Sequence, residues 1–190
     1  MKSINVLIVE DHLITLVGLK MVLQQWPTIA VVGEAQNGLE ALELIETLAP
    51  DVVLLDVGLP DIDGIECLSR IKKNGWPSRI LMRSSHEEVD VIMAAMAAGA
   101  DGYCFKDSSD SLLIEALELM ANGKAWIHPR VANQLLRFFN TPGRGQHFAR
   151  RAPSAQLDSQ DLALLTAIAR GDCGSAPEGL RDLLRKFESE

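Results

Sequence analysis

The sequence predicts an α/β fold in which helices cover both faces of a five-stranded parallel sheet, followed by a short all-α C-terminal region. Short apolar runs alternate with segments of helical periodicity five times in the first 122 residues, and such connections are right-handed crossovers between parallel strands. A hydrophobic content of 47% and a mean hydropathy of +0.10 indicate a buried core. We expect one α/β domain over 1–127, a helix and flexible basic linker over 128–156, and a short helical region over 157–190.

Each strand is expected as a short apolar run, and each helix as apolar residues recurring at intervals of three and four. The expected strands are Ile4 to Val9, Ile29 to Val32 with a continuation near Glu34, the run that ends at Asp56, Arg79 to Arg83, and Ala100 to Phe105. The helices between and after them are expected around Leu16 to Leu23, Leu39 to Leu48, Ile65 to Ile71, Val89 to Met96 and Leu113 to Met120. Proline and glycine end several of these elements, as at Pro27, Pro50 and Gly75.

Polar side chains stand where these strands end. The first strand ends in the acidic pair Glu10-Asp11, the third in Asp56, the fourth near Ser84 and the fifth at Lys106. The carboxyl ends of parallel strands meet at one edge of the sheet, where such folds carry their sites. Three carboxylates gathered there repel one another unless something neutralises them, and hard oxygen ligands suit Mg²⁺. We therefore expect a magnesium site with a reactive Asp56, although a lone Asp before a Gly/Pro loop is ordinarily a turn former or helix cap.

The charge is distributed unevenly. The net charge is -8, yet residues 1–127 hold 9 Lys/Arg against 19 Asp/Glu, residues 128–151 hold 5 Arg and no acid, and residues 152–190 hold 4 Lys/Arg against 7 Asp/Glu. The acidic first domain would not seek nucleic acid. No charged-then-apolar leader precedes Ile4 and no apolar run is long enough to span a bilayer, so we expect a cytoplasmic protein without membrane contact. Three cysteines without metal-ligand spacing, Cys67, Cys104 and Cys173, predict reduced structural thiols.

Four motifs carry a resemblance to a known family. They are Glu10-Asp11, the block from Asp56 to Gly64, Ser84-Ser85-His86, and Gly102 to Asp107. The gaps are 45 residues from Asp11 to Asp56, 28 from Asp56 to Ser84 and 22 from Ser84 to Lys106. Residues 1–127 thus resemble the receiver domain of two-component response regulators, most closely the NarL/FixJ (LuxR-type) branch. The resemblance implies a flavodoxin-like, doubly wound (βα)5 receiver.

The same resemblance implies a role for each residue at the strand ends. Asp56 would be the phosphoacceptor that takes a phosphoryl group from a sensor histidine kinase. Mg²⁺ would be bound by Asp11, Asp56 and the main-chain carbonyl of Gly58, with Glu10 acting through bound water. Lys106 would pair with the Asp56 carboxylate at rest and with the acyl phosphate afterwards.

Ser84 would donate its hydroxyl to the phosphoryl group, and Tyr103 would turn inward behind it, linking the site to the face of the fourth helix, fifth strand and fifth helix. Two alternatives stay open: Tyr103 as ordinary packing, and Ser85 as the switch hydroxyl if the strand shifts register by one. Arg83 replaces the apolar residue expected before the hydroxyl. By alternation it should face away from Ser84 and affect packing or a partner surface more than the chemistry. His12 and His86 are expected to be loop or helix-start residues, since Mg²⁺ prefers oxygen.

The C-terminal region is less regular. Val131 to Phe139 predicts a helix, and Asn140 to Ser154 combines Pro, Gly and Arg as a flexible basic linker does. Residues 157–171 resemble the opening helix of a NarL/FixJ helix-turn-helix domain. We expect only one further amphipathic helix, which leaves a partial helix-turn-helix without a supported recognition helix. Its apolar residues are expected to be buried against protein: Leu180, Leu183, Leu184 and Phe187.

Two functions follow from this pattern. The first is a non-enzymatic response regulator of a phosphorelay that is phosphorylated on Asp56, depends on Mg²⁺ and switches protein contacts. Its partners would be a sensor histidine kinase and, on phosphorylation, a second copy of the chain. The alternative is a DNA-binding transcriptional regulator of the NarL/FixJ type. A phosphatase-like enzyme is disfavoured because the sequence has no signature of a separate substrate pocket.

Overall fold

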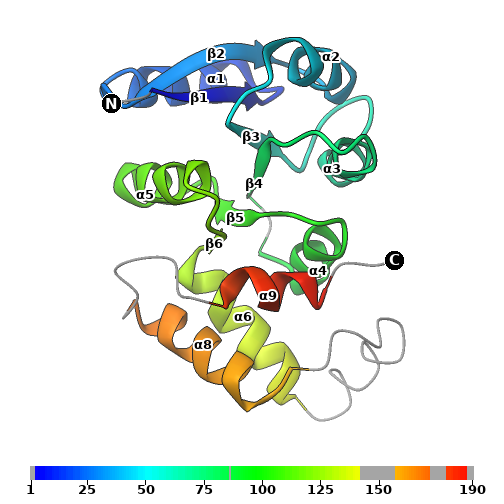
Figure 1. Ribbon diagram of the computed structural model, residues 1–190, viewed down its shortest axis with the longest axis vertical. Coiled ribbons are helices and arrows are strands. Elements are labelled where there is room, and N and C mark those ends of the chain that lie inside the picture. Colours follow the sequence, from blue (N-terminus) through cyan, green and yellow to red (C-terminus); the bar gives the residue numbers. More distant parts are fainter. Residues whose placement is uncertain (1–2, 86, 142–156, 172–178, 188–190) are drawn as a thin grey trace.

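The structure is a computed structural model that describes residues 3–85, 87–141, 157–171 and 179–187. It contains a parallel sheet of six strands in the order β2-β1-β3-β4-β5-β6 (Figure 1). The strands are β1 (Ile4–Val9), β2 (Ile29–Ala35), β3 (Val52–Asp56), β4 (Arg79–Ser84), β5 (Gly102–Phe105) and β6 (Trp126–Ile127). The order reverses between β1 and β3, so the carboxyl ends of these neighbours form the switch point at which doubly wound sheets place their sites.

Helices cover both faces of the sheet, as expected. Figure 1 shows α1 (Leu13–Leu23) and α5 (Asp110–Ala121) on one side, and α2 (Gly38–Leu48), α3 (Gly64–Lys73) and α4 (Val89–Ala97) on the other. Alternate residues of each strand pack into two different apolar cores. Ile8, Leu54 and Leu81 pack toward α1 and α5, whereas the residues next to them along their strands pack toward α2, α3 and α4. All five residues of β3 are buried, which is typical of a central strand in a parallel sheet.

The sixth strand corrects the five expected from the sequence. β6 is only two residues long, and it pairs with the start of β5 through Gly102–Trp126 and Tyr103–Ile127. A Cβ atom at Gly102 would lie 2.7 Å from the carbonyl oxygen of Trp126, so glycine at this position lets the two strands approach. The edge strand leads directly into the C-terminal helices.

In the described part of the chain, three helices lie beyond the β6 edge in Figure 1: α6 (Pro129–Asn140), α8 (Ser159–Arg170) and α9 (Leu180–Arg185). Asp158 and Asp161 form a capping box at the start of α8, and Gly171 ends it in a left-handed conformation. The expected burial of the apolar residues around α9 is confirmed, because each is at most 3% exposed: Leu180, Leu183, Leu184 and Phe187. These side chains belong to the same apolar core as α4 and α6, so the C-terminal helices pack onto the α/β domain.

Two further expectations bear on the described residues. Cys67 and Cys104 are free, buried thiols, and burial raises the pKa of each to about 12. No helix in the described ranges combines the length and the apolar character needed to cross a membrane. The linker arginines, His86 and Cys173 lie outside the described residues.

Candidate functional site

The block from Asp56, at the end of β3, to Gly64 contains three aspartates with different surroundings. Asp61 accepts hydrogen bonds from the backbone N–H groups of Gly38 and Leu39, at 2.8 and 2.9 Å, at the start of α2. Asp63 caps α3 by accepting from the Glu66 N–H at 2.8 Å. Asp56 caps neither helix, and its side chain points toward the other strand ends. Asp61 and Asp63 thus cap the starts of α2 and α3, whereas Asp56 combines a turn contact to the Gly58 N–H with a contact to Lys106.

Gly64 allows α3 to begin directly beside the end of β3. A Cβ atom there would lie 2.0 Å from the carbonyl oxygen of Asp56, so no other residue fits without moving the backbone. At Gly58, by contrast, an added Cβ would meet nothing within 4 Å. The Gly58 N–H donates to Asp56 Oδ1 at 3.2 Å, a contact that needs only the main chain. The loop thus contacts the Asp56 side chain through the Gly58 N–H and passes close to the Asp56 carbonyl oxygen at Gly64.

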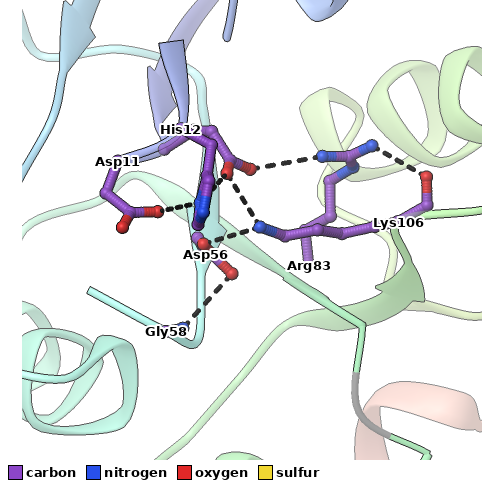
Figure 2. A network of polar contacts seen from close by, with 7 residues as sticks. Asp11, His12, Asp56, Gly58, Arg83 and Lys106 are labelled. Carbon is purple, nitrogen blue, oxygen red and sulfur yellow. Dashed lines mark hydrogen bonds and ion pairs between the residues drawn. The ribbon is translucent and has the colours of Figure 1, made fainter. Parts of the chain in front are cut away.

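Four charged side chains meet at the carboxyl ends of β1, β3, β4 and β5 (Figure 2). Lys106 Nζ donates to Asp56 Oδ2 at 2.7 Å and to Glu10 Oε1 at 2.8 Å. Glu10 and Asp56 are only 1% and 3% exposed, so these contacts take the place of water around both carboxylates. Burial alone would lower the pKa of Lys106, but the hydrogen bonds and charges of Asp56 and Glu10 outweigh it and raise that pKa. Lys106 is therefore a permanent cation that bridges two buried carboxylates.

Arg83 joins this group, a contact that the sequence did not predict. Its Nη1 lies 3.4 Å from Glu10 Oε2, and its Nη2 donates to the carbonyl oxygen of Lys106 at 2.9 Å. Alternation does turn Arg83 away from Ser84, as expected. The expectation that it affects packing or a partner surface more than the chemistry stays a prediction, but its contacts place it beside Glu10 and Lys106.

Asp11 lies at the outer edge of the cluster. Its Oδ1 is 2.7 Å from Nδ1 of His12, and the same nitrogen is 3.6 Å from Glu10 Oε1. Within the described residues, Glu10, Asp11 and His12 form a group whose potential ligand atoms all lie within 4.8 Å of one another. Asp56 is not part of that group, and its Oδ2 lies against Lys106. His12 is the N-cap of α1, as expected for a helix-start residue, and its ring also lies against the Asp11 and Glu10 carboxylates.

Ser84 and Tyr103 occupy the other face of the sheet. Ser84 is fully buried at the end of β4, whereas Ser85 is exposed. Among the described residues, the Tyr103 hydroxyl has no hydrogen-bond partner of good geometry. Burial raises the pKa of Tyr103 to about 12, although the nearby Ser84 hydroxyl opposes that rise. The Tyr103 ring stacks edge-on against Phe105, with 5.9 Å between ring centroids. Ser84 therefore lies next to Tyr103, and Tyr103 is turned inward.

The charge of the cluster suits a divalent cation. The cluster contains three carboxylates and two cations, so acidic groups are in excess. The carboxylates are those of Glu10, Asp11 and Asp56, and the cations are Lys106 and Arg83. Every carboxylate oxygen at this edge is a hard donor of the kind Mg²⁺ prefers, and Asp11 is half-buried with one side open to solvent. These residues fit a magnesium ion held by carboxylates with part of its water shell retained.

Comparison with known proteins identifies the family. Residues 6–118 match the family model described as the response regulator receiver domain. The transcriptional regulatory protein DegU of Brevibacillus brevis is 32% identical over 135 residues, which cover 71% of this chain and 57% of DegU. The response regulator UvrY of Escherichia coli K12 is 31% identical over 168 residues, which cover 88% of this chain and 75% of UvrY. The chain thus spans little more than half the length of DegU.

A solved structure agrees with these relatives. The two-component response regulator of the LuxR family from Aurantimonas sp. SI85-9A1 superposes with a TM-score of 0.68 at 31% identity, covering 72% of this chain and 97% of that one. The chain therefore belongs to the response regulator receiver family, with relatives among the LuxR-type regulators.

Proposed function

We propose that this protein is the phosphorylated switch of a two-component phosphorelay, with Asp56 as the phosphoacceptor. The observation that carries the proposal is the placement of a buried carboxylate 2.7 Å from a permanent cation, next to two more carboxylates at a sheet edge. Phosphoryl transfer requires positioning and charge neutralisation rather than a set of acid and base groups. Residues 1–127 would form the receiver, and a sensor histidine kinase would supply the phosphoryl group.

In the proposed reaction, a carboxylate oxygen of Asp56 forms a bond to the phosphorus atom as the bond to the histidine nitrogen of the kinase breaks. The imidazole leaves with the electron pair of that bond, and Asp56 becomes an acyl phosphate. Lys106 would balance the charge that develops on the phosphoryl oxygens, since its ammonium already lies against Asp56 Oδ2. Ser84 would donate its hydroxyl to the same group from the opposite face of the sheet.

Asp11, Asp56 and the Gly58 carbonyl would hold Mg²⁺, and Glu10 would act through a bound water. When bound, the ion would supply Lewis-acid neutralisation of the phosphoryl oxygens. The chain itself orients the acceptor: the Gly58 N–H and Lys106 fix the two oxygens of Asp56 from different sides. Tyr103 would pass the state of Ser84 to the surface of α4, β5 and α5, where a protein partner or a second copy would bind.

A mass measurement tests this function directly. The protein is incubated with Mg²⁺ and a small phosphodonor, and the mass gain of one phosphoryl group is compared between the wild type and Asp56→Asn. We expect the gain in the wild type only. Asp63→Asn is the matched control, because it removes a charge from the same loop while asparagine still caps α3. An equal gain in Asp56→Asn would move the acceptor to another residue.

The second candidate is a DNA-binding regulator, which the similarity to DegU, a transcriptional regulatory protein, favours. Both candidates share the chemistry at Asp56 and differ in output. The described C-terminal helices bury their apolar side chains against the α/β domain, which supports control of protein contacts. We therefore place the DNA-binding function second.

A further inference from the structure

Arg83 is the charged residue of the cluster that the proposed reaction leaves without a role. Its side chain is 11% exposed, and it projects from β4 toward α1 and α5, where its neighbours on the sheet are Leu81 and Cys104. A guanidinium is costly to bury among apolar groups unless its charge and N–H groups are matched. Two of its nitrogens meet their partners at the phosphorylation site: Nη1 faces Glu10 and Nη2 donates to the backbone of Lys106.

These two contacts connect Arg83 to Glu10 and to Lys106, the two residues that meet at the site. Glu10 receives Lys106 on Oε1 and Arg83 on Oε2, so each of its oxygens faces a cation. The carbonyl of Lys106 is fixed by Arg83 while its ammonium reaches Asp56. Removing Arg83 would leave Glu10 with one cation, and Lys106 would be free to move toward it and away from Asp56.

The charge balance predicts how the loss of Arg83 would change the affinity of the cluster for Mg²⁺. With Arg83 in place, three carboxylates face two permanent cations. Without it they would face one, and the cluster would attract a divalent cation more strongly. Arg83 thus opposes Mg²⁺ binding at the same time as it holds Lys106 in position for phosphoryl transfer. Damage to the fold would weaken both properties together, whereas loss of this function would move them in opposite directions.

We propose that Arg83 is a positioning residue that acts through Glu10 and Lys106, lowering the affinity of the carboxylate cluster for Mg²⁺ and aligning Lys106 with Asp56. The inference rests on the proposed function of Asp56. It adds that Arg83, the second cation beside Lys106, determines the Mg²⁺ concentration that the site requires. It predicts that this protein needs a higher Mg²⁺ concentration than the same protein with a neutral residue at position 83.

The test uses two neutral variants, Arg83→Gln and Arg83→Met, so that a failure of one to fold leaves the other. Mg²⁺ affinity is measured by titration calorimetry without phosphodonor. The rate of acyl-phosphate formation is measured separately by mass at saturating Mg²⁺. Arg79→Gln is the matched control, because Arg79 is on the same strand at its opposite end and pairs with Asp101 at 2.8 Å. Arg83→Lys keeps the charge at the site.

We expect the neutral variants to bind Mg²⁺ about three- to tenfold more tightly, from the loss of one nearby positive charge, and to be phosphorylated more slowly. Arg83→Lys should restore the wild-type affinity, and Arg79→Gln should change neither property. In a Glu10→Gln background, Arg83→Gln should have a smaller effect on affinity than in the wild type, because the two residues act as a pair.

The outcomes separate the two proposals. If the wild type binds Mg²⁺ and gains a phosphoryl group, but the neutral variants match Arg79→Gln, Arg83 has no positioning role and the function of Asp56 stands. If affinity and rate fall together in both neutral variants, the contacts of Arg83 are structural only, and the inference is overturned. A wild type that neither binds Mg²⁺ nor gains mass would overturn the proposed function and this inference together.

Discussion

Truncation of Phe187 provides a direct test of how the C-terminal helices are held. Its ring is fully buried and lies 5.8 Å from the ring of Phe139 on α6, measured between centroids. Replacing a buried Phe with Ala typically costs about 3–5 kcal/mol, because apolar contacts are lost and a cavity remains. α9 is a helix of six residues, and helices of that length are not stable alone. We therefore expect Phe187→Ala to release α9 locally rather than to unfold the domain.

Hydrogen exchange followed by mass spectrometry measures this release. A loss of about 3 kcal/mol or more corresponds to roughly a hundredfold or greater drop in amide protection over 179–187. The drop cannot exceed the protection that α9 has in the wild type, which is set by the free energy of its local unfolding. Protection in β1 and β3 should not change. Arg185→Ala is the control, because its side chain is 59% exposed on the same helix and its removal should change stability by less than about 0.5 kcal/mol. Unchanged protection of α9 in Phe187→Ala would refute the packing argument.

Three shorter predictions concern the receiver. Mg²⁺ should raise the melting temperature of the wild type more than that of Asp11→Asn, and equal shifts would exclude Asp11 as a ligand. Ser84→Ala should slow acyl-phosphate formation by about tenfold, from the loss of a hydrogen bond to a charged group, whereas the exposed Ser85→Ala should not; the reverse order would make Ser85 the switch hydroxyl. Burial and the Arg130 charge lower the pKa of His128 below its ordinary value of 6.5, so its contribution to stability is complete above 6.5 and is lost as pH falls toward the lower folded-state pKa. Denaturant titrations on both sides of 6.5 should show a smaller pH dependence in His128→Asn, and an equal one would assign the effect to another group.

The sequence predicts the sheet well where apolar runs are long enough to carry a period. β1, β3 and β4 begin or end within a residue of the expected positions, because charged residues, glycine or proline stop each run. β6 cannot be predicted from the sequence pattern, because two residues are too few to show the alternation of a strand. Its signal is indirect and lies in Gly102, where a side chain would collide with the Trp126 backbone. Short edge strands depend on a neighbouring strand for their existence, so local pattern alone does not predict them.

The site shows a related limit. The placement of Glu10, Asp56 and Lys106 at one edge follows from counting strands, since polar residues at the ends of parallel strands must meet. The contact between Arg83 and Glu10 depends instead on which face each side chain takes and on the reach of a guanidinium across two strands. Alternation alone indicated that Arg83 turns away from Ser84, but the sequence does not show that the carboxylates share the face to which it turns.

The arrangement of charge in the C-terminal helices leads to a prediction about output. Specific DNA recognition needs side chains that reach base edges, together with several cations free to contact phosphate. In the part of the chain that the structure describes, Lys186 pairs with Asp158 at 3.1 Å and with Asp161 at 2.5 Å, and Arg185 lies 3.7 Å from Asp182. Residues 152–190 hold 4 Lys/Arg against 7 Asp/Glu, so this region offers phosphate little net attraction.

We therefore expect the phosphorylated protein to show no sequence-selective DNA binding at physiological ionic strength. Selection from a random pool of duplexes, with and without phosphodonor, measures this, and retention of the unselected pool at low and high salt is the control. The arginines of 128–151 could still retain DNA, but binding through such contacts should fall steeply with salt and enrich no motif. An enriched motif that requires phosphodonor would reverse the order of the two functions, because the acyl phosphate at Asp56 would then control a DNA contact rather than a protein one.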